Sequence, residues 1–260
     1  MGDPHHHCAL NVALYGASGK RWALTERGRN SLQRSASALS IGPSSLYWSG
    51  DALNILIDEV TAPWPTRVRG KVRLFPAAVT NQAFALDTEG AHSWWPIAPV
   101  SRVEVELDKP GLSWKGHAYL DCNFGAVPLE DDFTRWDWSR STLADGRTVV
   151  FYDVSRRRGG DMGLALRFDA NGEAGDLDPP PYQTLPDTSW KVARGARGDH
   201  GHPVRVEETL ENAPFYARSL VATRLFGEPA MAMHESLSLD RFRSGWVQIL
   251  LPFRMPRIAR

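Results

Sequence analysis

Short runs in which apolar and polar residues alternate make up most of this chain, and glycine and proline separate them. The segments 67–74 and 102–108 both place apolar or small residues at every second position, with charged residues between them. Such alternation is typical of a β-strand that has one buried face and one solvated face. Long helical periodicity is scarce. The pattern therefore predicts an all-β protein with antiparallel strands and few short helices.

The segment 112–125 separates into an apolar face and a polar face when every second residue is taken together. The apolar face holds Leu112, Trp114, Gly116, Ala118 and Leu120. The polar face holds Ser113, Lys115, His117, Tyr119 and Asp121. The first face predicts contact with a core. The second face aligns a histidine, a tyrosine and a carboxylate, so this strand is a candidate for chemistry.

A tight turn at Lys109–Gly111 joins this strand to the strand before it. The hairpin sets the register and carries Asp121 back toward the end at which residues near position 100 begin. The segment His92–Pro96 lies just upstream of that end. We therefore expect one group of side chains to meet here, namely His92, Trp94, Tyr119 and Asp121.

A second series of hairpins follows an acidic connection at Pro128–Phe133. Asp145-Gly146 is the strongest turn signal in the chain, and Asp169–Gly172 has the same character. Repeated hairpins after the connection favour a separate β unit over an extension of the first one. We expect an N-terminal unit over 1–133 and a C-terminal unit over 134–260.

Charge and cysteine content exclude several classes of partner. Thirty basic and thirty acidic residues give a net charge of zero, which argues against a nucleic-acid partner. Two cysteines cannot build a disulfide framework, so a reducing compartment is expected. No apolar run approaches the roughly 20 residues of a membrane-spanning helix. Ten tryptophans suit a core or the wall of a pocket for an apolar ligand.

Each candidate residue also has an ordinary structural interpretation. Asp121 is the kind of residue that caps backbone N–H groups at a turn. His92 fits a surface loop, and Trp94 and Tyr119 fit a core. His117 shares the face of Asp121 and is a rival base. These alternatives stay open on the pattern of residues alone.

Two histidine-rich segments do not predict a metal site. Three adjacent histidines at His5–His7 cannot all face one ion from an extended strand. The segment Asp199–His202 has two histidines but no evident third or fourth ligand nearby. We expect no metal.

Several runs spread over the chain resemble carotenoid 1,2-hydratases, also called hydroxyneurosporene synthases. The runs are His7–Gly16, Arg21–Gly28, Ile41–Ser44, Ile57–Glu59, Trp114–Asp121, Trp136–Arg140, Glu208–Tyr216 and Leu250–Pro256. The resemblance implies two lipocalin-like antiparallel β-barrel units packed together. Relatives carry a further strand-like segment before the point that matches His7, where this chain has Met1–Pro4. The first barrel is therefore expected to be shortened at its N-terminus.

The resemblance implies a hydro-lyase that adds water to the terminal 1,2 double bond of acyclic carotenes such as neurosporene and lycopene. The product is a tertiary alcohol, and no cofactor is expected. The implied catalytic residues are Asp121, His92, Tyr119 and Trp94. The implied substrate contacts are Trp95, His117, Phe124 and Trp114.

A mechanism follows from this implied site. Protonated Asp121 gives its proton to carbon 2, because a carboxyl group in a dry apolar channel retains its proton near neutral pH. The cation at carbon 1 faces the rings of Trp94 and Tyr119. His92 orients the attacking water and takes its proton.

Two other functions fit the same architecture, namely a carrier that binds a carotenoid unchanged and a cyclase that closes polyenes into rings. The carotene has to come from a membrane because it is nearly insoluble in water. We expect a peripheral protein on the cytoplasmic side of the inner photosynthetic membrane, with an apolar rim at the pocket mouth.

Overall fold

The computed structural model describes residues 3–16 and 19–258, and strands form most of this part of the chain. Met1 and Gly2, which open the predicted shortened N-terminus, lie outside the described residues. The helices are short, namely α1 (Leu129–Asp132), α2 (Leu239–Phe242) and α3 (Gly245–Arg254), with single 3-10 turns at Pro4–His6 and Arg29–Ser31. None of the helices described is long and apolar enough to pass through a membrane. The prediction of a mostly β protein with few short helices is confirmed.

Two compact units are present, and each draws on separate parts of the sequence. The first comprises Met1–Pro76, Ser101–Ala118 and Ile249–Arg260, and the second comprises Ala77–Val100 and Tyr119–Gln248. These boundaries differ from a division after residue 133, because the strands β10 (His92–Lys109) and β11 (Leu112–Gly125) each contribute to both units. The assignment of two lipocalin-like domains stays a prediction.

The strands of the first unit belong to an antiparallel sheet in the order β11-β10-β8-β7-β6-β5-β4, in which β9 (Phe84–Ala85) also pairs with β10. The remaining bounds are β4 (Leu32–Arg34), β5 (Ala38–Ile41), β6 (Ser44–Ser49), β7 (Ala52–Val60) and β8 (Arg67–Pro76). Val105 pairs with Val72, which in turn pairs with Ile55. The apolar positions Val68, Leu74 and Val105 are buried, so the predicted one-sided strands are confirmed.

Two small pairings complete the first unit. The strands β1 (Asn11–Leu14) and β2 (Arg21–Leu24) form a hairpin, and Val12 packs with Ile57 and Val68. The short strand β3 (Glu26–Arg27) pairs in parallel with β21 (Arg257–Ile258).

The first half of β11 differs from the prediction of a core-facing apolar side. Trp114 is 49% exposed and Leu112 is 36% exposed. Only Ala118 on this face packs against a core cluster of the same unit. The strand β11 stands at the end of the sheet order, so it has a strand neighbour on one side only. Alternation identified the strand correctly but did not identify which face is covered.

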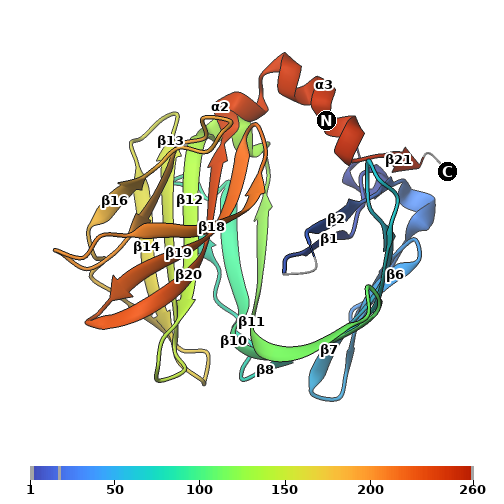
Figure 1. The fold of residues 1–260 in the computed structure, drawn as a ribbon, viewed down its shortest axis with the longest axis horizontal. Coiled ribbons are helices and arrows are strands. Elements are labelled where there is room, and N and C mark those ends of the chain that lie inside the picture. Colours follow the sequence, from blue (N-terminus) through green and yellow to red (C-terminus); the bar gives the residue numbers. More distant parts are fainter. Residues whose placement is uncertain (1–2, 17–18, 259–260) are drawn as a thin grey trace. The chain divides into compact units, whose positions relative to one another are not determined.

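The second unit is built on an antiparallel sheet in the order β15-β14-β13-β12-β20-β19-β18, in which β12, β13 and β14 lie side by side (Figure 1). The bounds are β12 (Phe133–Thr142), β13 (Thr148–Arg156), β14 (Met162–Phe168), β15 (Ala174–Asp176), β18 (Arg205–Asn212), β19 (Tyr216–Leu225) and β20 (Glu228–Ser238). Thr142 pairs with Thr148, which places the predicted turn at Asp145-Gly146. Gly146 has a φ of 85°, a conformation that glycine adopts without strain.

Each face of this second sheet is covered. On one face, a core cluster of the second unit includes Trp94, Phe133 and Tyr152. On the other, the hairpin of β16 (Tyr182–Leu185) and β17 (Arg194–Arg197) contributes Leu185 and Ala196 to a cluster with Val221 and Ala232. Among the described residues, no pairing joins the first and last strands of either large sheet. Closure into barrels therefore stays a prediction.

Candidate active site

Two side chains of the second unit donate hydrogen bonds to the same oxygen of Asp121. Trp94 Nε1 lies 2.8 Å from Asp121 Oδ2, and the Tyr119 hydroxyl lies 3.0 Å from it. Within residues 3–16 and 19–258, no hydrogen bond reaches the other oxygen, Oδ1. The structure thus brings together three of the four residues that the hairpin argument grouped. Their catalytic roles stay predictions.

Asp121 and Tyr119 line a cavity of about 290 Å³. The lining consists of Tyr119, Asp121, Asn123, Trp136, Trp138, Arg140, Tyr152, Arg218, Met233 and Glu235. All ten belong to the second unit. The cavity therefore has one carboxyl group on β11 and a wall built by the neighbouring sheet strands.

Strand register explains why these wall residues share one face. Trp138 on β12 pairs with Tyr152 on β13 and with Glu235 on β20. Glu235 pairs in turn with Arg218 on β19. Directly paired residues in an antiparallel sheet project to the same side, so these four form a continuous row across the sheet.

Aromatic rings surround the carboxyl group. The ring centroids of Tyr119 and Trp138 lie 5.5 Å apart, and those of Trp94 and Tyr152 lie 5.6 Å apart. Trp136 makes an edge contact with Tyr152 at 6.0 Å. Trp94 itself is fully buried and is not among the lining residues. Its contribution to the site is the hydrogen bond from its indole nitrogen.

Burial is the main influence on the carboxyl group of Asp121 and raises its pKa above the usual value. The hydrogen bonds from Trp94 and Tyr119 oppose this effect, since they favour the ionised form. The negative charge of Glu235 raises the pKa further, and the Arg140 guanidinium lowers it. The balance is a raised pKa, which favours a carboxyl group that keeps its proton.

The two tyrosines of the cavity are neutral hydrogen-bond donors. Burial raises the pKa of Tyr119 well above its usual value, and the Asp121 carboxylate adds to this. Burial likewise raises the pKa of Tyr152, whose hydroxyl donates to Asn123 Oδ1 at 3.1 Å. Neither phenol is therefore suited to accept a proton from water.

His92 does not join this cavity, which corrects the expectation that it meets Asp121. Its Nε2 lies 3.0 Å from Asp132 Oδ2, and its backbone N–H donates to Asp87 Oδ2 at 2.6 Å. Its ring packs 4.8 Å from the ring of Phe133. The side chain is buried among these contacts and is absent from the cavity lining, and its catalytic role stays a prediction.

The four expected substrate contacts are also absent from the cavity lining. Trp95 directs its indole N–H to the backbone oxygen of Thr80 at 3.0 Å, since neighbouring residues of a strand face opposite sides. Phe124 is 52% exposed for the same reason, because its neighbour Asn123 takes the inward position. Trp114 and His117 are exposed and belong to the first unit.

Several residues of the cavity lining were not predicted from the sequence, although the alternation of three of them was visible in it. Trp136, Trp138 and Arg140 alternate within the run Trp136–Arg140, so they share one face of a strand. That run supported only the family resemblance. Glu235 had no comparable signal, because its place depends on the register between β12 and β20.

Across the described part of the chain, no cluster of three or more histidine, cysteine, aspartate or glutamate side chains has an arrangement that could hold a metal ion. Within the aromatic wall of the cavity, the carboxyl groups of Asp121 and Glu235 are able to take part in acid–base chemistry.

Two solved structures share the fold of this chain. A protein from Nitrosomonas europaea assigned as AttH superposes with a TM-score of 0.58 at 14% identity, covering 88% of this chain and 80% of that one. Kievitone hydratase from Nectria haematococca superposes with a TM-score of 0.54 at 12% identity, covering 86% of this chain and 78% of that one. At these identities the likeness shows the fold alone. The chain has the fold that AttH and kievitone hydratase share.

The chain belongs to the carotenoid hydratase CrtC family, whose model matches residues 1–260. The acyclic carotenoid 1,2-hydratase of Thiocapsa roseopersicina is 58% identical over 99% of this chain and 64% of its own length. The acyclic carotenoid 1,2-hydratase of Rubrivivax gelatinosus is 50% identical over 99% of this chain and 63% of its own length. The enzyme of the same name from Cereibacter sphaeroides is 40% identical over 98% of this chain and 91% of its own length. The chain thus spans just under two thirds of the first two relatives.

Proposed function

We propose that this chain hydrates the terminal 1,2 double bond of acyclic carotenes, such as neurosporene and lycopene, to tertiary alcohols without a cofactor. The names of the family and of its relatives support the substrate class. The observation that carries the proposal is Asp121, a carboxyl group on the wall of an aromatic cavity. Its pKa is raised, and one of its oxygens has no hydrogen bond from the described residues. An alkene is a poor base, so its hydration needs such a proton donor.

The proton starts on Asp121, whose pKa is raised. We place this proton on Oδ1, because Oδ2 already accepts hydrogen bonds from Trp94 and Tyr119. From Oδ1 it passes to carbon 2 as the π electrons form the new C–H bond. The tertiary cation left at carbon 1 lies against the rings of Tyr119 and Trp138. Such cation–π contacts contribute about 0.5–2 kcal/mol each. Water then adds to carbon 1 and loses a proton.

We also infer that each unit is a lipocalin-like β unit and that the cavity receives the end of the carotene chain. The antiparallel order of both large sheets supports this inference. A cavity of about 290 Å³ suits the terminal part of the substrate, with the rest of the polyene lying outside it.

The test of the proposed function is replacement of Asp121 by asparagine, followed by incubation with lycopene or neurosporene in detergent. Asparagine keeps an oxygen for both donors but has no acidic proton to give. Chromatography should show hydroxylated carotene from the wild type and at least about a 100-fold loss with Asp121→Asn. Asp108→Asn, at an exposed position, is the matched control.

Three outcomes of this experiment contradict parts of the proposal. Wild-type activity in Asp121→Asn removes Asp121 as the acid. A wild-type protein that returns its carotene unchanged is a carrier. A wild-type protein that converts the polyene into rings is a cyclase.

We propose a peripheral membrane contact as the route by which the insoluble substrate arrives. The helix α3 exposes a row of large apolar side chains, with Ile249 at 70% and Phe253 at 69% exposure, and Arg243 precedes it. Exposed apolar and aromatic side chains beside basic ones suit an interfacial helix on an anionic bilayer.

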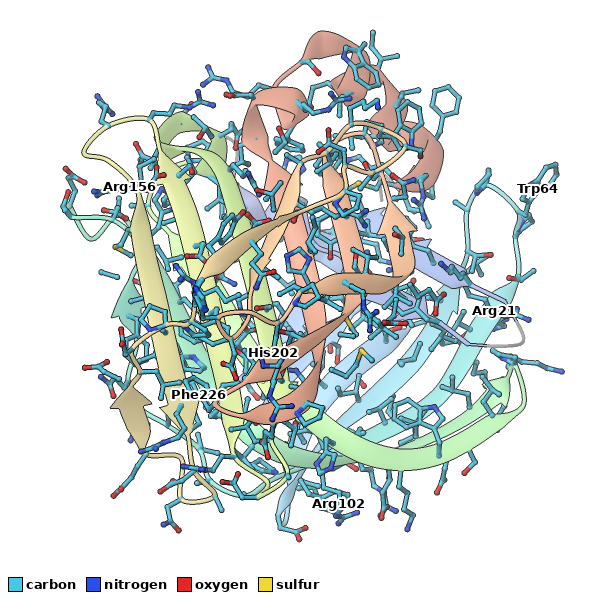
Figure 2. All side chains as sticks on the ribbon, turned by 60° about the vertical axis from the view of Figure 1, so that its left-hand side comes forward. Arg21, Trp64, Arg102, Arg156, His202 and Phe226 are labelled. Atoms are coloured by element: carbon cyan, nitrogen blue, oxygen red, sulfur yellow. The ribbon has the colours of Figure 1, made fainter. Side chains whose placement is uncertain are left out.

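Sedimentation with anionic phospholipid vesicles tests the contact. The double replacement Ile249→Ser and Phe253→Ser should reduce the bound fraction. Trp64 is the matched control, since its side chain is 80% exposed and points away from the ribbon at a loop tip (Figure 2). An equal loss of binding with Trp64→Ser, or no loss with the double variant, contradicts the assignment to α3.

A further inference from the structure

We propose that Glu235 is the catalytic base of this site. Its carboxylate, and not the imidazole of His92, holds the attacking water and takes a proton from it. This inference rests on the proposed function and assigns its second half-reaction. It follows from the placement of Glu235 in the cavity wall, from its pairing with Arg218 and from the absence of any other suitable base in the lining.

The position of Glu235 is set by strand pairing on both sides. Trp138 lies opposite it on β12 and Arg218 lies opposite it on β19. These side chains project to the cavity side of the sheet together. The Glu235 side chain is 24% exposed, so it is accessible to water while its surroundings restrict its movement.

The hydrogen bonds of Glu235 leave one of its oxygens for water. Arg218 Nε donates to Oε1 at 2.8 Å, and Arg218 Nη2 lies 2.7 Å from the same oxygen. In the described part of the chain, no hydrogen bond involves Oε2. Arg218 therefore fixes the orientation of the Glu235 carboxyl group, and the second oxygen is available to accept a hydrogen bond from water.

Asp121 and Glu235 form a complementary pair within one cavity. Asp121 is surrounded by aromatic rings and neutral donors, whereas Glu235 is bound to a guanidinium. Each uses one oxygen to fix its orientation and leaves the other without a hydrogen bond from described residues. Two carboxyl groups in contrasting environments are the usual basis for separate acid and base roles in one site.

The other polar groups of the lining do not fit the role of base. Tyr119 and Tyr152 are neutral phenols, and Asn123 is engaged as acceptor for Tyr152. Arg140 is cationic, with its guanidinium 5.4 Å from the Tyr119 ring centroid. No histidine belongs to the lining. Apart from Asp121, which is assigned as the proton donor, Glu235 is thus the remaining group in the lining that can accept a proton from water.

The step balances in atoms and charge. Asp121 loses a proton to carbon 2, and the alkene π pair forms that C–H bond. A lone pair of the water oxygen forms the new C–O bond at carbon 1, and one water proton moves to Glu235 Oε2. The sum is addition of one water molecule across the double bond. Proton return from Glu235 to Asp121 through water restores the starting state.

Deuterium labelling separates the two half-reactions. In D₂O, Asp121 exchanges its proton for deuterium and transfers a deuteron to carbon 2. If the resulting cation then loses the hydrogen that carbon 2 carried before, the double bond forms again. The recovered carotene then has deuterium at carbon 2. Glu235→Gln keeps the size and hydrogen-bonding capacity of the side chain but cannot take a proton. We expect Glu235→Gln to lose at least about 100-fold in hydrated product, the usual scale for a general base. Deuterium should still enter the recovered carotene.

Matched variants make each outcome decisive. Asp121→Asn should lose both product and deuterium incorporation. Glu228→Gln, on the same strand but outside the cavity lining, should retain both. Hydration by Glu235→Gln at the wild-type rate overturns the proposal, as does loss of both signals in a folded Glu235→Gln protein. A wild type without either signal contradicts the proposed function itself.

Discussion

Trp94 and Asp121 are joined by a hydrogen bond of 2.8 Å from the indole nitrogen to Oδ2. The indole is fully buried, whereas the carboxyl group opens onto a cavity. The bond links β10 to β11 near the end of their hairpin. It holds the carboxyl group by Oδ2, and no hydrogen bond from the described residues reaches Oδ1. The energetic balance at this one carboxyl group therefore affects both the proposed reaction and the stability of the protein.

The first prediction concerns the dependence of stability on pH. Burial raises the pKa of Asp121 in the folded protein, so the folded state binds more protons than the unfolded state above the usual carboxyl pKa. The free energy of unfolding should fall as the pH rises through that window. Asp121→Asn removes this contribution. Urea titrations between about pH 4 and pH 8 should show a smaller fall for the variant than for the wild type.

The measurement has an internal check at low pH. Below the usual carboxyl pKa, Asp121 is protonated in both the folded and the unfolded states. The difference between variant and wild type should therefore be nearly constant there. Asp137 also has a pKa raised by burial, but it is present in both proteins and cancels from the comparison. A larger fall with pH in the variant contradicts the argument.

The second prediction concerns the alkaline limb of the activity profile. The proposed reaction needs protonated Asp121, so kcat/KM should fall as the pH rises through the pKa of this carboxyl group. The hydrogen bond from Tyr119 lowers that pKa. Tyr119→Phe removes the bond, and the limb should move to higher pH by up to about one unit, since a hydrogen bond to a charged group contributes about 1.5 kcal/mol.

Phenylalanine retains the ring that packs against Trp138, so the cavity wall is kept. The direction of the shift is the decisive result. Movement of the limb to lower pH, or an unchanged limb with reduced kcat, shows that Tyr119 acts in another way. Assays in detergent over the whole pH range, with the same carotene for both proteins, provide the comparison.

The surroundings of Asp121 could be predicted from the sequence better than the rest of the candidate site. Alternation places Tyr119 and Asp121 on one face, and the turn at Lys109–Gly111 brings Trp94 near them. These relationships are local to one hairpin, and local register is visible in a sequence. The fold class was accessible for the same reason, since it depends on many short alternating segments.

The failures involve partners that lie far along the chain. His92 turns to Asp132 in the short helix α1, and no periodicity predicts where that helix docks. Glu235 reaches the cavity because β20 pairs with β12. In the sequence, most strands of the second sheet lie between these two. Long-range register of this kind depends on the packing of the entire sheet.

The third prediction tests the structural role of His92 through its neighbour Gly125. A Cβ atom at Gly125 would lie 2.6 Å from His92 Nδ1 and 3.1 Å from the backbone oxygen of Ala91. Gly125→Ala should therefore displace the imidazole and destabilise the fold by about 1–3 kcal/mol. Gly111→Ala is the matched control on the same hairpin, because a Cβ there meets nothing within 4 Å. Equal melting temperatures for the two variants contradict the close packing of His92.

The fourth prediction concerns a buried ion pair in the first unit. Arg27 approaches both oxygens of Glu59, at 3.2 and 2.8 Å, and Ser44 donates to the same carboxylate at 2.7 Å. The side chains of Arg27 and Glu59 are 9% and 0% exposed. Glu59→Ala leaves the guanidinium buried without its counter-charge, and the expected loss is about 3–5 kcal/mol in the free energy of unfolding.

An exposed pair in the same unit provides the control for Glu59→Ala. Arg69 and Asp108 lie 3.7 Å apart, with side chains 57% and 71% exposed. Water screens this pair, so Asp108→Ala should change the free energy of unfolding by less than about 1 kcal/mol. Urea midpoints of the two variants, measured with the same probe, compare the pairs directly. Similar midpoints would mean that water reaches Arg27 once Glu59 is removed, because only a desolvated guanidinium carries the larger penalty.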